Sequence, residues 1–205
     1  MELTFYISVF VTLFVVIDPI GLAPLYVALT SGEDTARRRA IAMRACVLSV
    51  ALLTLFGLLG EAVLGFVGIS MAAFRIAGGI LLFLTALEML FERRSKRRED
   101  QTGTDRPDPS VFPLAIPLIS GPGAIASMIL LTGEADRDWV LIFGIHLVMI
   151  LVVGVVFALF LAAPLLERLM GKTGINVITR LLGMLLAALA VQFVLDGLRD
   201  FATFG

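Results

Sequence analysis

The stretch DPIGLAP, residues 18–24, interrupts an apolar segment that reads FVTLFVVI before it and LYVAL after it. A carboxylate, two prolines and a glycine stand where a membrane helix is expected to continue. Proline removes an amide donor and clashes with the preceding turn, whereas glycine permits unwound backbone. The sequence therefore predicts a broken first helix. Such a break is tolerated at membrane depth only where it is packed in protein or lines a wet cavity.

The composition of the whole chain indicates an integral membrane protein. Of the 205 residues, 59% are hydrophobic and only 16% are charged, which is too little polar surface for a soluble domain. The net charge of −1 argues against nucleic-acid partners. The single cysteine, Cys46, and the single histidine, His146, predict no metal site and no cofactor. The opening MELTFYISVF has no basic leader, so we expect the first span to be retained.

Apolar segments of about 20 residues, the length needed to cross a bilayer, occur six times. The predicted spans are residues 3–29, 40–64, 70–91, 111–132, 139–163 and 176–197. Thirteen of the 16 Lys and Arg residues fall on one side of this arrangement, which predicts that the loops after spans one, three and five are cytoplasmic. We therefore expect a multi-pass protein of the cell inner membrane with both termini on the non-cytoplasmic side.

An internal similarity relates residues 61–82 to residues 167–186. Glu61, Gly65, Gly68, Ile69, Ser70, Arg75 and Gly78 match Glu167, Gly171, Gly174, Ile175, Asn176, Arg180 and Gly183 in order. Three spans in each copy make the copies opposite in orientation. The predicted fold is an all-α membrane protein of six transmembrane helices, built as two inverted three-helix repeats (1–92 and 111–205) joined by a cytoplasmic loop (93–110).

The repeat predicts a second break in span four, and PLAIPLISGPGAIA at residues 113–126 provides it. We expect new helix starts near 22–24 and 124–126. Their free amides and positive dipole attract a carboxylate, while the exposed carbonyls of the preceding half-helices suit an ammonium group. We expect broken helices one and four to cross near the bilayer midplane, where the two breaks together form a site that suits a zwitterion such as an amino acid.

The candidate substrate-binding residues come from both breaks. They are Asp18, Pro19, Gly21, Pro24, Ser120, Gly121, Pro122 and Gly123. Asp18 either binds the substrate ammonium or carries a coupling proton, or it caps the second half-helix by accepting from the amides at positions 20–21. We expect Pro24 and Pro122 to set the helix starts.

Two arginines at equivalent repeat positions are candidates for gates. Arg75 and Arg180 are expected either to pair with Glu61 and Glu167 respectively, or to extend towards the lipid headgroups. No nucleophile–base pair, Walker loop or HExxH motif occurs, so the sequence predicts no enzyme.

The chain resembles the MarC-type membrane family, which is related to the LysE-like exporters and includes neutral amino acid transporters. DPIGLAP at 18–24, SGPGAIA at 120–126 and FRIAGGILL at 74–82 carry the resemblance. Leu22 stands where the family often has Asn. The resemblance implies transport of small molecules across the inner membrane, with glycine, alanine or other neutral amino acids as substrates.

Three functions remain open at this point. We predict a secondary transporter that works by alternating access, with export mildly favoured by the resemblance. The alternatives are a non-transporting scaffold that interacts with membrane lipid, and a cation carrier that uses Asp18 and backbone carbonyls. Glycine-rich helix faces leave a homo-oligomer open.

Overall fold

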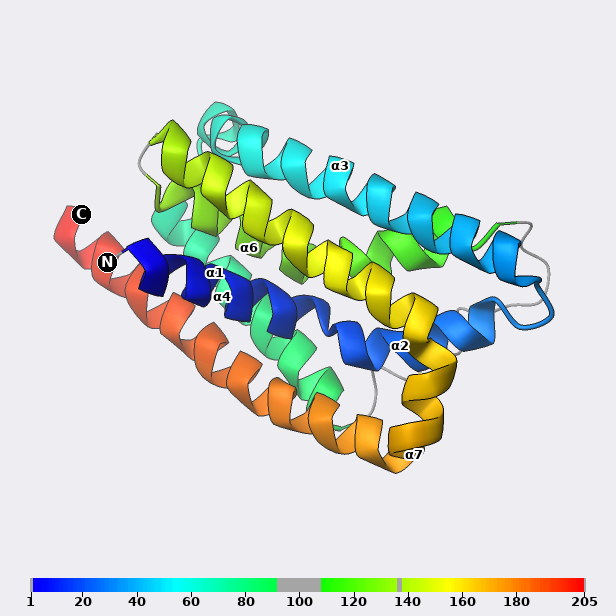
Figure 1. Cartoon of the computed structure of the whole chain (residues 1–205). Coiled ribbons are helices and arrows are strands. Elements are labelled where there is room, and N and C mark those ends of the chain that lie inside the picture. Colours follow the sequence, from blue (N-terminus) through cyan, green and yellow to red (C-terminus); the bar gives the residue numbers. More distant parts are fainter. Residues whose placement is uncertain (1, 92–107, 136–137, 205) are drawn as a thin grey trace.

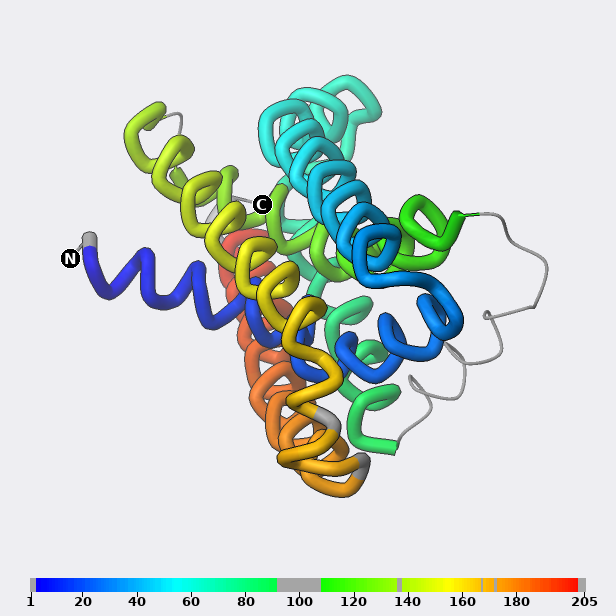
Figure 2. The backbone as a smooth tube through the Cα atoms, turned by 45° about the vertical axis from the view of Figure 1, so that its right-hand side comes forward, coloured from blue at the N-terminus to red at the C-terminus, as the bar shows by residue number. Residues whose placement is uncertain are grey.

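The computed structural model describes residues 2–91, 108–135 and 138–204, and all regular structure within these ranges is helical (Figure 1). The elements in chain order are α1 (Glu2–Ile17), α2 (Pro19–Leu29), α3 (Thr35–Val67), α4 (Met71–Leu90), η1 (Ser110–Ile119), α6 (Pro122–Gly133) and α7 (Trp139–Phe204). α7 turns back on itself at Gly171, where φ is 61°, and so forms two limbs (Figure 2). The membrane-protein class is confirmed, because the helices are long and strongly apolar.

Among the described residues, five helical segments are long and apolar enough to cross a membrane. They are Leu3–Leu29, Thr35–Val67, Met71–Leu90, Trp139–Leu166 and Thr173–Ala202. A sixth is obtained if η1 and α6, which meet at an angle of 54°, form one bent span. Five of the six predicted spans thus have a counterpart, and the fourth, 111–132, has one if the bent pair is a single span. Most of the predicted loop 93–110 lies outside the described residues.

α3 extends beyond its predicted span at both ends because each end is capped. The Asp34 side chain accepts a hydrogen bond from Arg37 N at 2.7 Å, which satisfies a free amide of the first turn. At the other end Gly68 adopts φ 81°, a left-handed conformation that suits glycine and ends the helix. The polar first turns therefore continue the helix past the apolar stretch that hydropathy detects.

The helices form one bundle in which α1 and α2 pack against α7, and α6 packs against α3 and α4. The two chain ends lie at the same end of this bundle (Figure 1). The core is apolar and includes Tyr26, whose ring stacks on Phe160 with centroids 4.5 Å apart. The first span, Leu3–Leu29, which α1 and α2 form together, is half buried inside the bundle.

α4 approaches two neighbours closely through adjacent glycines. A Cβ at Gly78 would lie 3.2 Å from the Leu130 side chain of α6, and one at Gly79 would lie 2.8 Å from the carbonyl oxygen of Ala190 in α7. Gly197 of α7 faces α4 in the same way, since its Cβ would lie 3.0 Å from Ala72 O. Small residues let helix backbones approach in a membrane, where packing replaces hydrophobic association.

Candidate functional site at two helix breaks

The first break is a single residue, Asp18, between α1 and α2. Asp18 is fully buried and adopts φ 55° and ψ 63°, the left-handed region that Asp visits more readily than most side chains. Because Pro19 has no N–H, it cannot donate to the carbonyl of Val15 four residues earlier. The amide of Gly21 donates to Asp18 Oδ1 at 3.1 Å instead of continuing the helical ladder. The carbonyl of Val15 therefore receives no helical hydrogen bond from the residue four positions further on.

The capping interpretation of Asp18 is confirmed, although the helix starts earlier than predicted. α2 begins at Pro19 rather than near 22–24, and Pro24 lies inside it. The predicted start was wrong because proline is well tolerated at the first helical position, where its missing amide has no partner to lose. Even so, α1 and α2 remain aligned well enough to count as one span from Leu3 to Leu29.

The second break lies between η1 and α6. α6 begins at Pro122, two residues before the predicted region 124–126, and Pro122 sets this start as expected. Gly121 precedes Pro122 as the N-cap residue, and it has no side chain that could accept a hydrogen bond from the first amides of α6. The Ser120 hydroxyl points to α3, where it donates to Ser49 O at 3.4 Å. This break therefore presents backbone amides, whereas the first break presents a carboxylate.

The two breaks lie beside each other inside the bundle. A Cβ at Gly123 would lie 3.4 Å from Val16 Cγ1, two residues before Asp18, and 3.1 Å from Leu82 Cδ2. Ser127, one turn further along α6, is fully buried, and its hydroxyl oxygen has no hydrogen-bond partner within the described part of the chain. The structure thus brings together 16–21 and 121–127, which are separated by about half of the sequence.

One polar residue near the first break was missed by sequence reasoning. Thr179 lies on the second limb of α7, and a Cβ at Gly21 would lie 2.9 Å from Thr179 Oγ1 and overlap Asp18 Oδ2. The hydroxyl and the carboxylate therefore approach each other across Gly21, which has to lack a side chain. A threonine in an apolar helix is a weak sequence signal for a binding site, because its hydroxyl usually donates to a carbonyl of its own helix.

The predicted partner of Arg75 was wrong. Its guanidinium pairs with Asp200 Oδ2 at 2.9 Å and with Glu134 Oε1 at 3.2 Å, and its side chain is only 14% exposed. These contacts tie α4 to the residue after α6 and to the last turns of α7. Arg75 does not reach Glu61, because the α4 face that carries it is turned towards α6 and α7.

Glu61 and the other predicted gate residues lie elsewhere. Glu61 faces a cavity of about 560 Å³ whose lining includes Gly57, Thr132 and Trp139. Arg180 is exposed on the second limb of α7. The side chain of Glu167 lies outside the described residues, so its pairing with Arg180 stays a prediction.

The Arg75 cluster leads to a pH prediction for Arg75→Gln. Burial raises the pKa of Glu134, and the neighbouring Arg75 opposes this rise. A carboxyl whose pKa is raised on folding favours the folded state while it is protonated, and this contribution is lost as the pH rises through the folded-state pKa. Without Arg75 the pKa of Glu134 rises further, so the melting temperature in detergent should fall more as the pH is raised above the ordinary glutamate pKa of 4.5 than it does in the wild type.

The double variant Arg75→Gln/Glu134→Gln is the control for that measurement. It removes the titrating carboxyl, so the added pH dependence should disappear while any loss of packing at Arg75 remains. An unchanged slope in Arg75→Gln would show that Glu134 does not depend on Arg75.

Comparison with known proteins assigns the chain to a family. The fold defines a multi-pass helical membrane protein with two adjacent helix breaks, and residues 3–202 match the model of the MarC family of integral membrane proteins. The chain belongs to this family, which confirms the resemblance seen in the sequence. No solved structure matches it.

Its relatives match over nearly their whole lengths. A UPF0056 membrane protein of Methanocaldococcus jannaschii is 34% identical, with 97% of this chain and 98% of the relative covered. The UPF0056 membrane protein YhcE of Escherichia coli is 37% identical, with 95% and 92% covered. The inner membrane protein YhgN of the same species is 34% identical, with 94% and 95% covered. These names state a membrane location for the relatives and mention no enzymatic activity.

Proposed function

We propose that the protein is a secondary transporter of small amphoteric solutes, with neutral amino acids as the substrate class. The observation that carries this proposal is the adjacency of the two helix breaks, shown by the 3.4 Å approach of Val16 to the Cβ position of Gly123. Irregular backbone at membrane depth is costly unless it is enclosed or lines a cavity. Two such breaks side by side therefore support a site for a polar solute.

The chemistry of the two breaks is complementary to the two ends of an amino acid. The Asp18 carboxylate and the Val15 carbonyl, which loses its helical donor at Pro19, suit an ammonium group, and the Thr179 hydroxyl adds an acceptor beside Asp18. The uncapped start of α6 offers amides at the positive end of a helix dipole, which suit a carboxylate. The buried Ser127 hydroxyl adds a further hydrogen-bonding group on α6.

The chain order supports a mechanism of alternating access. Each half has an interrupted helix followed by a long helix and a third helix that begins after a left-handed glycine, Gly68 or Gly171. This order supports inverted three-helix repeats that move relative to each other around the site. The Arg75 cluster joins α4, α6 and α7 and would serve as a gate at one end. We place the protein in the inner membrane, as the name of YhgN states for that relative.

The test is counterflow of radiolabelled amino acids in proteoliposomes containing the full-length protein. Glycine, alanine and serine should exchange above the rate in protein-free vesicles, whereas lysine and glutamate should not. Gly123→Leu should lower the exchange at least tenfold, because its side chain would enter the space between Val16 and Leu82. The same substitution at Gly154, where a Cβ meets nothing within 4 Å, is the matched control.

The alternatives make different predictions in the same assay. A cation carrier would move sodium or a divalent ion without any amino acid, and a scaffold would move no solute from the panel. Either result, obtained with folded protein, would overturn the proposal.

A further inference from the structure

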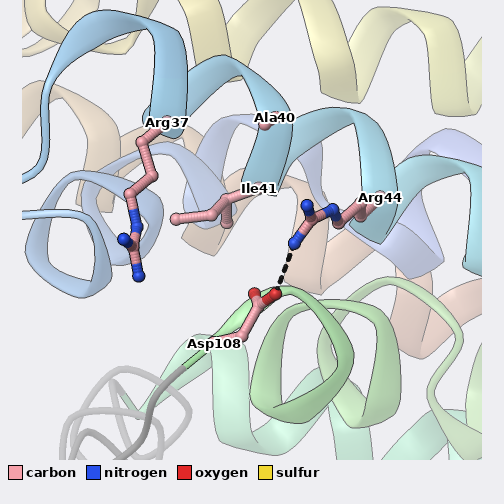
Figure 3. A pocket seen from close by; sticks show the side chains of 5 residues that line it. All are labelled: Arg37, Ala40, Ile41, Arg44 and Asp108. Carbon is pink, nitrogen blue, oxygen red and sulfur yellow. Dashed lines mark hydrogen bonds and ion pairs between the residues drawn. The ribbon is translucent and has the colours of Figure 1, made fainter.

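A cavity of about 270 Å³ lies at the end of the bundle where α3 begins, away from the helix breaks. It is lined by Arg37, Ala40, Ile41, Arg44 and Asp108 (Figure 3). Arg37 and Arg44 are seven residues apart, which places them two turns apart on one face of α3. The short side chain of Ala40 stands between them, and Asp108 faces them from the residues just before η1.

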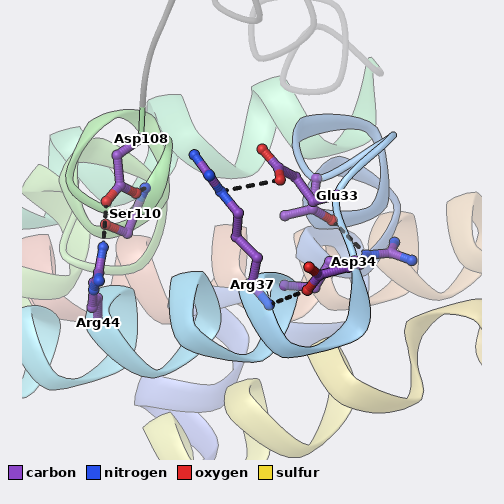
Figure 4. Close-up of polar contacts among 8 residues, drawn as sticks. Glu33, Asp34, Arg37, Arg44, Asp108 and Ser110 are labelled. Atoms are coloured by element: carbon purple, nitrogen blue, oxygen red, sulfur yellow. Dashed lines mark hydrogen bonds and ion pairs between the residues drawn. The ribbon is translucent and has the colours of Figure 1, made fainter.

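The charged side chains around this cavity form two solvent-exposed ion pairs. Arg44 Nη1 contacts Asp108 Oδ2 at 2.7 Å, and Arg37 Nε contacts Glu33 Oε2 at 3.0 Å (Figure 4). The two arginine side chains are 58% and 66% exposed, so these ion pairs are weak and can exchange for another anion.

Hydrogen bonds orient two charged side chains at or near the cavity, Asp108 and Arg38. Asp108 is oriented by Ser110, whose amide donates to its Oδ1 at 3.0 Å, and hydrogen bonds from Ser110 keep the pKa of Asp108 below its ordinary value. Arg38 is directed elsewhere, since its Nε donates to Thr30 Oγ1 at 3.0 Å. The cavity is therefore lined by two exposed, ion-paired guanidinium groups and one ionised carboxylate.

The cavity adjoins the apolar surface that faces lipid. Met43 and Val47 follow Arg37 and Ala40 along α3 and are exposed, and Val111 and Phe112 are exposed at the start of η1 after Asp108. Exposed apolar side chains on a membrane-spanning helix contact acyl chains. A ligand at this boundary would have an anionic group for the arginines and an apolar part for the membrane.

We propose that this cavity binds the headgroup of an anionic phospholipid, with the guanidinium groups of Arg37 and Arg44 on its phosphate oxygens and the acyl chains along Val47 and Val111. Arginine presents several donors in a planar fork that matches phosphate oxygens. Glu33 pairs with Arg37 and Asp108 pairs with Arg44, so a headgroup phosphate has to compete with both carboxylates. A headgroup with no ammonium group of its own keeps its full negative charge for the arginines, which favours an anionic headgroup over a zwitterionic one. Asp108 occupies Arg44 in the structure and competes with the lipid for it.

The test is native mass spectrometry of the purified full-length protein in detergent, titrated with short-chain phosphatidylglycerol. Phosphatidylcholine of the same chain length and free glycerol phosphate are the comparison ligands. Phosphatidylglycerol should bind most tightly, and Arg37→Gln and Arg44→Gln should each weaken it about fivefold, from about 1 kcal/mol per basic residue near an anionic lipid. Arg39→Gln, on the same helix but outside the cavity lining, should change the affinity less than twofold.

Asp108→Asn distinguishes a lipid site from a structural latch. If the lipid competes with Asp108 for Arg44, this variant should bind phosphatidylglycerol about two- to fivefold more tightly, opposite in sign to Arg44→Gln. Weaker binding in both variants would show that the pair only supports the local structure and would overturn the proposal. Equal binding of phosphatidylcholine, equal binding of glycerol phosphate, or an equal effect of Arg39→Gln would overturn it as well.

Discussion

Asp18→Asn is expected to lower amino acid exchange in proteoliposomes roughly tenfold or more, while the unfolding free energy changes by less than about 1 kcal/mol. Asparagine tolerates the left-handed conformation and can still accept from the amide of Gly21, so the cap on α2 is retained. The negative charge is lost, however, and with it the charge-assisted hydrogen bond to a substrate ammonium. Hydrogen bonds to charged groups contribute about 1.5–3 kcal/mol, which corresponds to a tenfold or larger effect.

Asp18→Ala separates the two roles of this residue. Alanine loses the cap, at a cost of about 1 kcal/mol, and tolerates the left-handed backbone poorly, at a further cost of about 1–2 kcal/mol. It should therefore lose both exchange and thermal stability, whereas Asp18→Asn loses exchange alone. Full exchange by Asp18→Asn would show that the carboxylate serves only as a helix cap.

Gly79→Val is expected to destabilise the protein by about 3 kcal/mol or to prevent its folding. A Cβ at this position would lie 2.8 Å from Ala190 O and 3.1 Å from Val194 N, which are backbone atoms of α7 that cannot move aside alone. Overpacking usually costs about 1–3 kcal/mol, and contact with backbone places this variant at the upper end. Unfolding by sodium dodecyl sulfate in mixed micelles measures the change.

Gly154→Val is the matched control for this substitution. Gly154 is also a helical glycine, but it is exposed on α7 and a Cβ there meets nothing within 4 Å. It should leave the unfolding free energy within about 1 kcal/mol of the wild type, because valine and glycine both have low helix propensity. If the two variants destabilise equally, the close approach of α4 to α7 is not what makes Gly79 sensitive.

Local chemistry explains which parts of this molecule were predictable. Proline and glycine act on their own backbone, so the breaks at Asp18 and at Ser120–Gly121 were predictable from the sequence alone. The helix starts were predicted too far along the chain, since Pro19 and Pro122 are compatible with the first helical turn and begin the helices themselves. Apolar length located the spans but missed the capped polar turns that extend α3.

Partners across the bundle were not predictable in the same way. Arg75 pairs with Glu134 and Asp200, which lie 59 and 125 positions further along the chain. The repeat pattern pointed to Glu61 only because a Glu and an Arg recur at equivalent positions in both halves. Thr179 became part of the site because the second limb of α7 packs against α2. No neighbour in the sequence marks that contact.

The sequence by itself determined that this chain is a multi-pass helical membrane protein with two interrupted helices, because hydropathy, proline and glycine act over a few residues. The repeat also predicted that the two interruptions meet, and Gly123 does lie against Val16. Tertiary structure alone decided that Thr179 approaches Asp18 and that Arg75 binds Glu134 and Asp200. These contacts depend on how whole helices rotate and cross, and that geometry arises from packing between distant segments.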